Sequence, residues 1–404
     1  LTQAIGLLDE LPDRSSYLEQ ELAMQVALGR ALTLRKGYGA PEAEPIYERA
    51  RNLCQQVDDV QRRAEVLRGL WAFHLLRAEL DPAAELAEEI LELSQSTNDT
   101  DLIAGAYHTT GTSLFFQGKF SEAYEHSELG FSKYQHRAQH AQTVRYGDNP
   151  GVMCGIYTAL DLWMLGYPDQ ALQRLKDSER LVQEVDRAVD TTLWLTFAAR
   201  LHAHRQEADL AGEYATRAIA LSEEHGFPFF LSYANVLKGW TLLSSGLVDD
   251  GVDLMKKGLE ARAATGTVVL QSYFSAQLAE FLASAGQAKM GQRLFVDAFE
   301  NLKSTGERWC EAELYRIGGA IKSAQPEMDE GEAEASLLSA ISVARAQKAK
   351  SWELRAATDL ARLWQARGRT REAHELLAPV YDWFTEGFDT ADIRSARALL
   401  RDLT

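Results

Sequence analysis

Gly118-Lys119-Phe120-Ser121-Glu122-Ala123 and Gly166-Tyr167-Pro168-Asp169-Gln170-Ala171 are two copies of one phrase, in which a glycine is followed five residues later by an alanine. Related breaks lie at 206–211, 246–251, 286–291 and 368–373, so that a break returns about every 40 residues where no loop intervenes. The runs between the breaks are rich in helix-forming residues and poor in proline. A break at a fixed period indicates an array of helix pairs.

Small residues recur twelve positions apart across each of these breaks. The pairs are Gly111 with Ala123, Ala159 with Ala171, Ala199 with Ala211, Gly239 with Gly251, Ala279 with Gly291, and Ala361 with Ala373. Two antiparallel helices that pack at about 8–10 Å need a small side chain from each helix at the crossing. A seventh pair, Gly318 with Ala333, is expected around a longer loop.

This register resembles that of tetratricopeptide repeats, whose period is ~34 residues. The resemblance implies an all-α, right-handed superhelical solenoid of antiparallel helical hairpins, here with a period of about 40 residues. We predict helices from 101–117 and 120–134 through to 351–366 and 370–384. The expected organisation is looser helical hairpins over 1–100, regular repeats over 101–388 with an insertion loop at 134–150, and a capping helix over 389–404.

The charge balance narrows the class of partner. The 404 residues carry 42 Lys and Arg against 59 Asp and Glu, a net charge of −17, which argues against nucleic acid and against an anionic membrane surface. No apolar stretch reaches the ~18 residues that span a bilayer. The three cysteines, Cys54, Cys154 and Cys310, are far apart and form no C-x-x-C pair, which favours a reducing, cytoplasmic setting.

Several phrases go beyond a generic repeat. They are Arg-Tyr-Gly-Asp-Asn-Pro-Gly-Val at 145–152, Glu-Arg-Trp-Cys-Glu-Ala-Glu-Leu-Tyr-Arg at 307–316, Ala-Lys-Ser-Trp-Glu-Leu-Arg-Ala-Ala at 349–357 and Trp-Phe-Thr-Glu-Gly-Phe-Asp-Thr-Ala-Asp at 383–392. Together they resemble the C-terminal tetratricopeptide-like repeat region of bacterial multidomain signalling ATPases, which are often fused to class III adenylate or guanylate cyclase domains. The resemblance covers nearly the whole chain, most convincingly 60–402, and implies a sensor or regulatory arm in signal transduction.

We expect no catalytic residue, no cofactor and no metal in this chain. No G-x-x-x-x-G-K-[ST] phosphate loop occurs, so no nucleotide site is carried over from the resemblance. His136 and His140 share a helical face, but no cysteine or H-E-x-x-H context accompanies them. A hidden hydrolase or transferase is the alternative of a different class.

Binding is predicted on the concave surface, which the first helix of each hairpin lines in tetratricopeptide superhelices. Aromatic side chains supply buried area there and a few polar groups fix orientation. The predicted ligand- or peptide-binding residues are His108, Thr112, Phe116, Trp163, Thr196, Arg200, His204, Tyr233, Trp240 and Tyr273. Arg200 on an apolar wall would favour an anionic partner. The alternative for each aromatic is packing between neighbouring hairpins.

The insertion loop is the second candidate region. Its residues Arg145, Tyr146, Asp148 and Asn149 belong to a turn-forming stretch, either a grafted functional loop or a tolerated surface insertion. The leading hypothesis is a non-catalytic domain that binds a protein, peptide or small molecule in its concave groove. Attached ATPase or cyclase domains are expected in the full-length protein. A stand-alone adaptor or scaffold with the same groove is the alternative.

Overall fold

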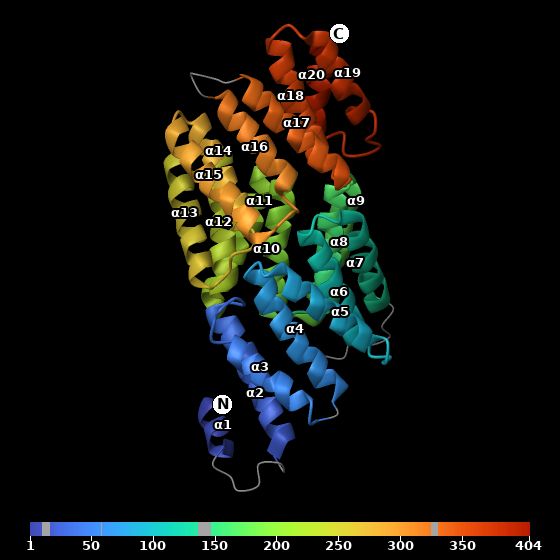
Figure 1. Cartoon of the computed structure of the whole chain (residues 1–404), viewed down its shortest axis with the longest axis vertical. Coiled ribbons are helices and arrows are strands. Elements are labelled where there is room, and N and C mark those ends of the chain that lie inside the picture. The colour runs from blue at the N-terminus through green and yellow to red at the C-terminus, as the bar shows by residue number, and fades with distance from the viewer. Residues whose placement is uncertain (10–16, 58, 136–146, 325–329) are drawn as a thin grey trace.

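The computed structural model describes residues 1–9, 17–57, 59–135, 147–324 and 330–404, and within them it contains α-helices and no β-strand. The helices pair along one elongated body, with the two termini toward opposite ends (Figure 1). Their bounds are α1 Thr2–Asp9, α2 Leu18–Lys36, α3 Glu44–Cys54, α4 Val60–Leu76, α5 Leu80–Ser94, α6 Thr100–Phe116, α7 Phe120–Gln135, α8 Pro150–Met164, α9 Pro168–Val185, α10 Ala188–His204, α11 Ala208–His225, α12 Pro228–Ser244, α13 Val248–Ala264, α14 Gln271–Ser284, α15 Ala288–Thr305, α16 Glu311–Ser323, α17 Glu330–Ala346, α18 Lys350–Ala366, α19 Thr370–Tyr381 and α20 Ala391–Asp402. No helix within these residues is long and apolar enough to cross a lipid bilayer.

In the middle of the array, the first helix of a hairpin lies inside and the second lies outside. In α8, every residue from Pro150 to Met164 is buried. In α9, the buried residues recur at steps of three and four, as at Ala171, Leu175 and Ser178, which is the single buried stripe of an outer helix. The expected all-α array of antiparallel hairpins is confirmed.

The small residues sit where paired helices cross. A Cβ placed on Gly251 would lie 2.8 Å from the backbone nitrogen of Leu243 and 3.0 Å from the carbonyl oxygen of Gly239. A Cβ on Gly291 would lie 2.5 Å from the carbonyl oxygen of Ala279. Any larger side chain at these two glycines would push the helix axes apart, which confirms the twelve-residue register at both crossings.

The seventh expected crossing, Gly318 with Ala333, is wrong by one residue. Gly318 faces the ring of Phe295 on the preceding hairpin, whereas Gly319 faces Ala333 and Leu337 on the partner helix α17. A Cβ on Gly319 would lie 3.2 Å from the carbonyl oxygen of Ala333. The connection between α16 and α17 is longer than in the other hairpins, so the twelve-residue spacing does not apply there.

Helix ends follow local chemistry. At the start of α8, the side chain of Asn149 accepts a hydrogen bond from the backbone nitrogen of Val152 at 3.0 Å, and Pro150 takes the first helical position, where its missing N–H costs nothing. At the end of α6, Gly118 has a φ of +74°, a conformation that L side chains rarely adopt. The phrase at 118–123 therefore begins in the turn between α6 and α7 and continues into the first residues of α7.

Two stretches that are far apart in the chain meet along a seam. The carbonyl oxygen of Leu76, at the end of α4, accepts hydrogen bonds from the backbone nitrogens of Val268 and Val269, at 2.7 and 3.1 Å. The carbonyl oxygen of Phe116, at the end of α6, accepts from the nitrogens of Arg308 and Trp309, at 2.9 and 3.3 Å. One turn of the superhelix therefore rests directly on the next.

The seam continues toward the C-terminus. The hydroxyl of Ser351 donates to the carbonyl oxygen of Trp163. The carboxylate of Glu386 accepts from the backbone nitrogens of Asp169 and Gln170 at the start of α9, at 2.9 and 3.0 Å. The seam carries three of the phrases that stand out in the sequence, namely 307–316, 349–357 and 383–392.

Candidate functional site

The ten side chains predicted on the concave face are all buried. Their exposed fractions run from 0% at Thr196 to 7% at Trp240. The other eight are His108, Thr112, Phe116, Trp163, Arg200, His204, Tyr233 and Tyr273. On α6, α8 and α10 the expected exposure is wrong, and the alternative of packing between hairpins holds for the aromatic residues there. The seam brings aromatic residues of the later hairpins against these three helices, so their inner face packs on protein instead of water.

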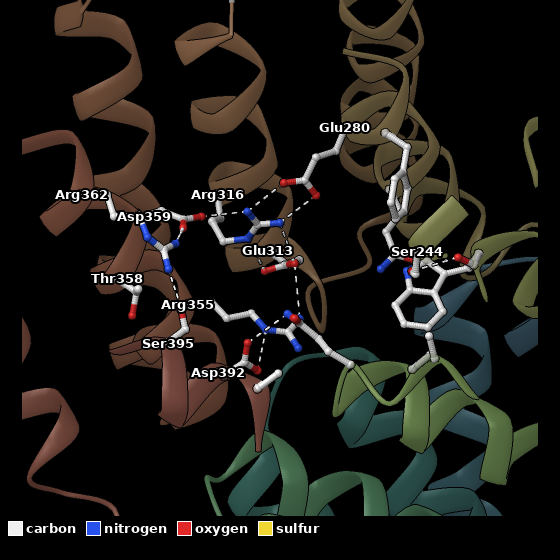
Figure 2. A pocket seen from close by; sticks show the side chains of 17 residues that line it. Ser244, Glu280, Glu313, Arg316, Arg355, Thr358, Asp359, Arg362, Asp392 and Ser395 are labelled. Atoms are coloured by element: carbon white, nitrogen blue, oxygen red, sulfur yellow. Dashed lines mark hydrogen bonds and ion pairs between the residues drawn. The ribbon is translucent and has the colours of Figure 1, made fainter. Parts of the chain in front are cut away.

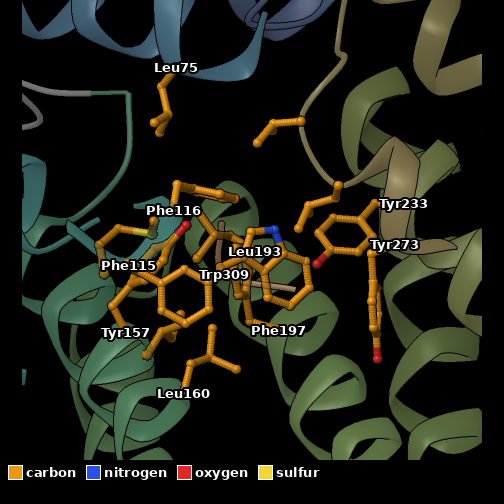
Figure 3. Packing of buried hydrophobic residues seen from close by; sticks show 14 of the residues in the cluster. Leu75, Phe115, Phe116, Tyr157, Leu160, Leu193, Phe197, Tyr233, Tyr273 and Trp309 are labelled. Carbon is orange, nitrogen blue, oxygen red and sulfur yellow. The ribbon is translucent and has the colours of Figure 1, made fainter. Parts of the chain in front are cut away.

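Aromatic rings from both turns fill the axis of the superhelix (Figure 3). The ring of Trp309 stacks on Phe115 with centroids 5.6 Å apart and lies 4.8 Å from the ring of Tyr273. Trp352 meets Trp163 edge-on at 4.8 Å. Aromatic pairs in this range contribute beyond the area they bury. Here the rings hold one turn of the superhelix against the next.

Arg200 is enclosed by rings. Its guanidinium carbon lies 4.7 Å from the centroid of Trp309 and 5.3 Å from that of Phe115. Its Nε donates to Nε2 of His204 at 3.2 Å. Burial, together with the charges of Arg200 and Arg355, holds the pKa of His204 well below its usual range, so this ring is neutral and can accept. The cation is 1% exposed and meets ring faces at the place where we expected an anionic ligand.

The insertion loop divides between described and undescribed residues. Arg145 and Tyr146 lie outside the described part of the chain, as do His136 and His140. Asp148 forms an ion pair with Arg68 on α4. This pair borders a cavity of about 50 Å³, too small for a peptide.

Asn149 holds the loop to the body of the protein. Its side-chain amide donates to the hydroxyl of Tyr134 at 2.8 Å, and its backbone nitrogen donates to Oδ1 of Asp190 at 2.8 Å. The carboxylate of Asp190 also lies 3.2 Å from Nε of Arg187. Burial raises the pKa of Asp190 from 3.8 to about 6, against the opposing effects of Arg187 and the Asn149 amide.

This raised pKa predicts a pH dependence of stability. The folded protein binds the Asp190 proton more tightly than the unfolded chain, so the contribution of this group falls as pH rises from about 4 to about 6 and is constant above. The loss across that window is about 3 kcal/mol. In Asp190→Asn this component disappears. The free energy of unfolding of both proteins can be measured by urea denaturation from pH 4 to 7 and plotted against pH. The two curves should converge or cross, whereas parallel curves would refute the assignment.

A polar cavity of about 540 Å³ opens farther along the array, walled by α12, α14, α16, α18, α20 and the turn between α10 and α11. A second cavity of about 480 Å³ adjoins it and shares four of its residues. We call the two together the charged channel. Its charged residues are Glu280, Glu313, Arg316, Arg355, Asp359, Arg362 and Asp392.

Arg316 lies at the centre of the channel and joins three successive first helices (Figure 2). Its five N–H groups bond Glu280 on α14, Glu313 on α16 and Asp359 on α18, at 2.8–3.0 Å. Burial alone would lower the pKa of this guanidinium, but the three carboxylates raise it well above its usual value. Arg316 therefore stays charged and fixes the spacing of the three helices.

Arg355 connects the channel to the seam. Its Nε donates to Asp392 on α20 at 2.8 Å, and its Nη2 donates to the carbonyl oxygen of His204 in the earlier turn. Its guanidinium carbon lies 5.2 and 5.0 Å from the rings of Trp163 and Trp352. The channel is therefore built where two turns of the superhelix meet.

No family model matches this chain, and no curated protein matches it in sequence. Solved structures match it in shape. A Rap protein complexed with competence and sporulation factor has a TM-score of 0.62 at 11% identity, covering 95% of this chain and 100% of that one. The Rap conjugation gene regulator of plasmid pLS20, in complex with the Phr* peptide, has a TM-score of 0.56 at 10% identity, covering 96% of each chain. The apo quorum sensor NprR from B. thuringiensis has 0.52 at 13%, covering 92% and 98%.

The fold is a tetratricopeptide-like solenoid. The likeness to these three proteins lies in the fold, because identities of 10–13% carry no residue roles. It spans almost the whole of this chain and of each of the three matched chains.

The prediction of binding residues from the sequence identified only one edge of the charged channel. Of the ten predicted residues, Trp240 lines the charged channel. The prediction ended at α14 and missed Arg316, Arg355 and Arg362. A usable signal was present, because arginines and carboxylates recur, mostly at three- and four-residue steps, on the first helices at 311–323 and 350–366, whereas α6, α8, α12 and α14 each carry a single Asp, Glu, Lys or Arg.

The chemistry of the solenoid favours binding. Among the described residues, no group of three or more His, Cys, Asp or Glu side chains is arranged to hold a metal ion. Burial raises the pKa of the thiols of Cys154 and Cys310, which keeps them protonated and unreactive. Each carboxylate of the channel is held by an arginine. The channel can therefore recognise a ligand by charge and hydrogen bonding.

Proposed function

We propose that this solenoid is a non-catalytic domain that binds a peptide or short protein segment in the charged channel. It would serve as the sensor or regulatory arm of a bacterial signalling ATPase or cyclase. The observation that carries the proposal is the cavity of about 540 Å³, which is within the range of ligand pockets and is walled by five helices and a turn. One of the solved structures of similar fold contains the Phr* peptide, and another contains competence and sporulation factor.

The position of the channel suggests how occupancy is transmitted. Gln206 belongs to the α10–α11 turn and donates to Oδ1 of Asp392 on α20 at 3.0 Å, so the two sides of the channel come from different turns of the superhelix. A ligand that contacts both sides binds the closed seam better than an open one and shifts the population toward it. Because repeats contact their neighbours, a small change of pitch adds along the array. An attached ATPase or cyclase domain would sense that change.

The resemblance of 307–316, 349–357 and 383–392 to the signalling ATPases supports the regulatory role. These phrases lie on the seam, so the residues that carry the resemblance are those that set the pitch. The stand-alone adaptor uses the same channel without an attached domain. The regulatory arm and the stand-alone adaptor can be distinguished with the full-length protein isolated from its source. The measurement is whether ATP hydrolysis responds to the channel ligand.

Binding in the channel can be tested with a random pentapeptide library. The protein is mixed with the library, separated by gel filtration, and the retained peptides are identified by mass spectrometry. We expect retained, uncleaved peptides, and we expect Ser244→Trp to reduce retention by about tenfold because the indole fills the cavity. Ser244 is exposed and lines the channel.

The matched control is Ser304→Trp, on an exposed position of the outer helix α15. It should retain peptides like the wild type. Equal retention by Ser244→Trp would place binding elsewhere. Cleaved peptides would contradict the non-catalytic assignment, and no retained peptide at all would refute the function.

A further inference from the structure

The hydrogen bonds of the charged channel leave few donors for a ligand. Arg316 has five N–H groups, and all five are used on Glu280, Glu313 and Asp359. Arg355 uses its Nε and Nη2 on Asp392 and a backbone carbonyl. Arg316 is therefore committed to the protein, and an anionic ligand would have to displace a carboxylate from it. The N–H groups that Arg355 has left are poorly accessible, because its side chain is 9% exposed and its Nη1 lies 3.6 Å from Oε1 of Glu313.

The same network leaves acceptors free. An ionised carboxylate has about four lone-pair positions. Glu280 and Asp359 each accept two hydrogen bonds, and Asp392 accepts one from Arg355 and one from Gln206. Each of these three carboxylates can accept further N–H groups without losing a present partner. The side chains of Glu280 and Asp359 are 29% and 26% exposed, so they are within reach of a ligand.

Two glutamines extend this acceptor surface. The amide nitrogen of Gln206 donates to Asp392 at 3.0 Å, and that of Gln277 donates to the hydroxyl of Tyr273 at 3.0 Å. Both glutamines line the channel, and within the described part of the chain their carbonyl oxygens accept no hydrogen bond. In each side chain one amide N–H is bonded to the protein, and the carbonyl oxygen is left for the channel.

Trp240 adds a second kind of contact. It lines the channel and is 7% exposed, and its Nε1 donates to no group among the described residues. An N–H without a protein partner in a binding cavity can donate to a ligand, and a peptide carbonyl is a suitable acceptor. With Phe281, its indole also provides an aromatic wall on which a cation can rest.

Charge points the same way. The channel is lined by three arginines and four carboxylates. Of the three arginines, Arg362 is the one whose Nε has no hydrogen-bond partner among the described residues. Its side chain is 49% exposed. An exposed cation is well screened and contributes little. The whole chain carries −17, which draws cations toward a polar cleft.

We propose that the channel selects a basic peptide, placing a lysine or arginine side chain against Glu280, Asp359 and Asp392 and a peptide carbonyl on Nε1 of Trp240. The inference rests on the proposed function and names the class of peptide. A free polyamine shares the cationic groups but has no carbonyl for Trp240, so it should bind more weakly than the peptide.

The test uses one exposed position with two opposite charges. Ser244→Lys places a tethered ammonium in the channel, and Ser244→Glu adds a carboxylate, while neither replaces a member of the ion-pair network. Three pentapeptide pools are compared by gel filtration and mass spectrometry, with lysine or arginine, glutamate or aspartate, or glutamine or asparagine at the centre. Spermidine is the competitor. Circular dichroism confirms that both variants are folded.

The wild type should retain the basic pool at least about tenfold better than the acidic pool, and less so at high salt. Ser244→Lys should lower retention of the basic pool, and Ser244→Glu should keep or raise it. Preferential retention of the acidic or neutral pool overturns the selectivity but leaves peptide binding standing. Displacement of the basic pool by spermidine at equal concentration overturns the assignment to a peptide. Loss of all three pools refutes the proposed function itself.

Discussion

Replacing Trp309 with alanine is expected to lower the free energy of unfolding by about 3–5 kcal/mol. Trp309 is fully buried, stacks on Phe115, and lies under the guanidinium of Arg200. Its Nε1 donates to the buried carboxylate of Glu307 at 3.0 Å, and its backbone nitrogen bonds the carbonyl oxygen of Phe116. The substitution therefore opens a cavity on the axis and removes one partner of Arg200 and of Glu307 at the same time.

The measurement is urea denaturation combined with hydrogen exchange. Because a solenoid can unfold piecewise, exchange should rise first in α6 and α16, the two helices that the seam joins at this level. Leu129→Ala, which removes a side chain that is 48% exposed on α7, is the control and should change stability by less than about 0.5 kcal/mol. Equal effects of the two substitutions would mean that the axial rings do not hold the turns together.

Replacing Arg316 with methionine is expected to cost about 3 kcal/mol at pH 7. The substitution leaves the carboxylates of Glu280, Glu313 and Asp359 close together without the cation that bonds all three. Methionine keeps much of the volume, so the loss reports on charge more than on packing. Arg316→Lys should recover only part of it, because one ammonium cannot supply five N–H bonds in a planar fork.

The pH dependence distinguishes this loss from a packing defect. Without Arg316, mutual repulsion raises the pKa values of the three carboxyls in the folded protein above those of the unfolded chain. The folded variant then binds protons more tightly, so its deficit relative to the wild type should shrink as pH falls from 7 to 5. Arg362→Met, which removes a half-exposed guanidinium from the same channel, should cost less than about 1 kcal/mol. A deficit that is constant with pH would contradict the electrostatic explanation.

The hairpin array was predictable because it depends on short-range rules. The twelve-residue spacing of Gly239 and Gly251 reports a crossing within one hairpin, and the structure places both glycines in that crossing. Where the hairpin connection lengthens, the twelve-residue spacing no longer applies, and the prediction placed the crossing at Gly318 although the structure places it at Gly319. Local spacing is thus a reliable guide only while the turn keeps its length.

The candidate site was only partly predictable. Trp240 was correctly placed on an inner helix, and it lines the channel. Arg200 and His204 were also placed on an inner helix, but ring contacts from the later turn bury them. No spacing within one hairpin distinguishes these positions from Trp240, because all three occupy comparable places on first helices.

The sequence by itself determined the helices, their pairing and the inner or outer place of each, because these follow from periodicity and from the size of side chains at a crossing. Only the tertiary structure decided which part of the inner surface is filled and which is open. That choice depends on contacts such as Ser351 with Trp163, which are 188 positions apart, and on how one superhelical turn settles on another. The inner face is sealed where axial rings meet across the seam, and it stays open where charged side chains bridge it.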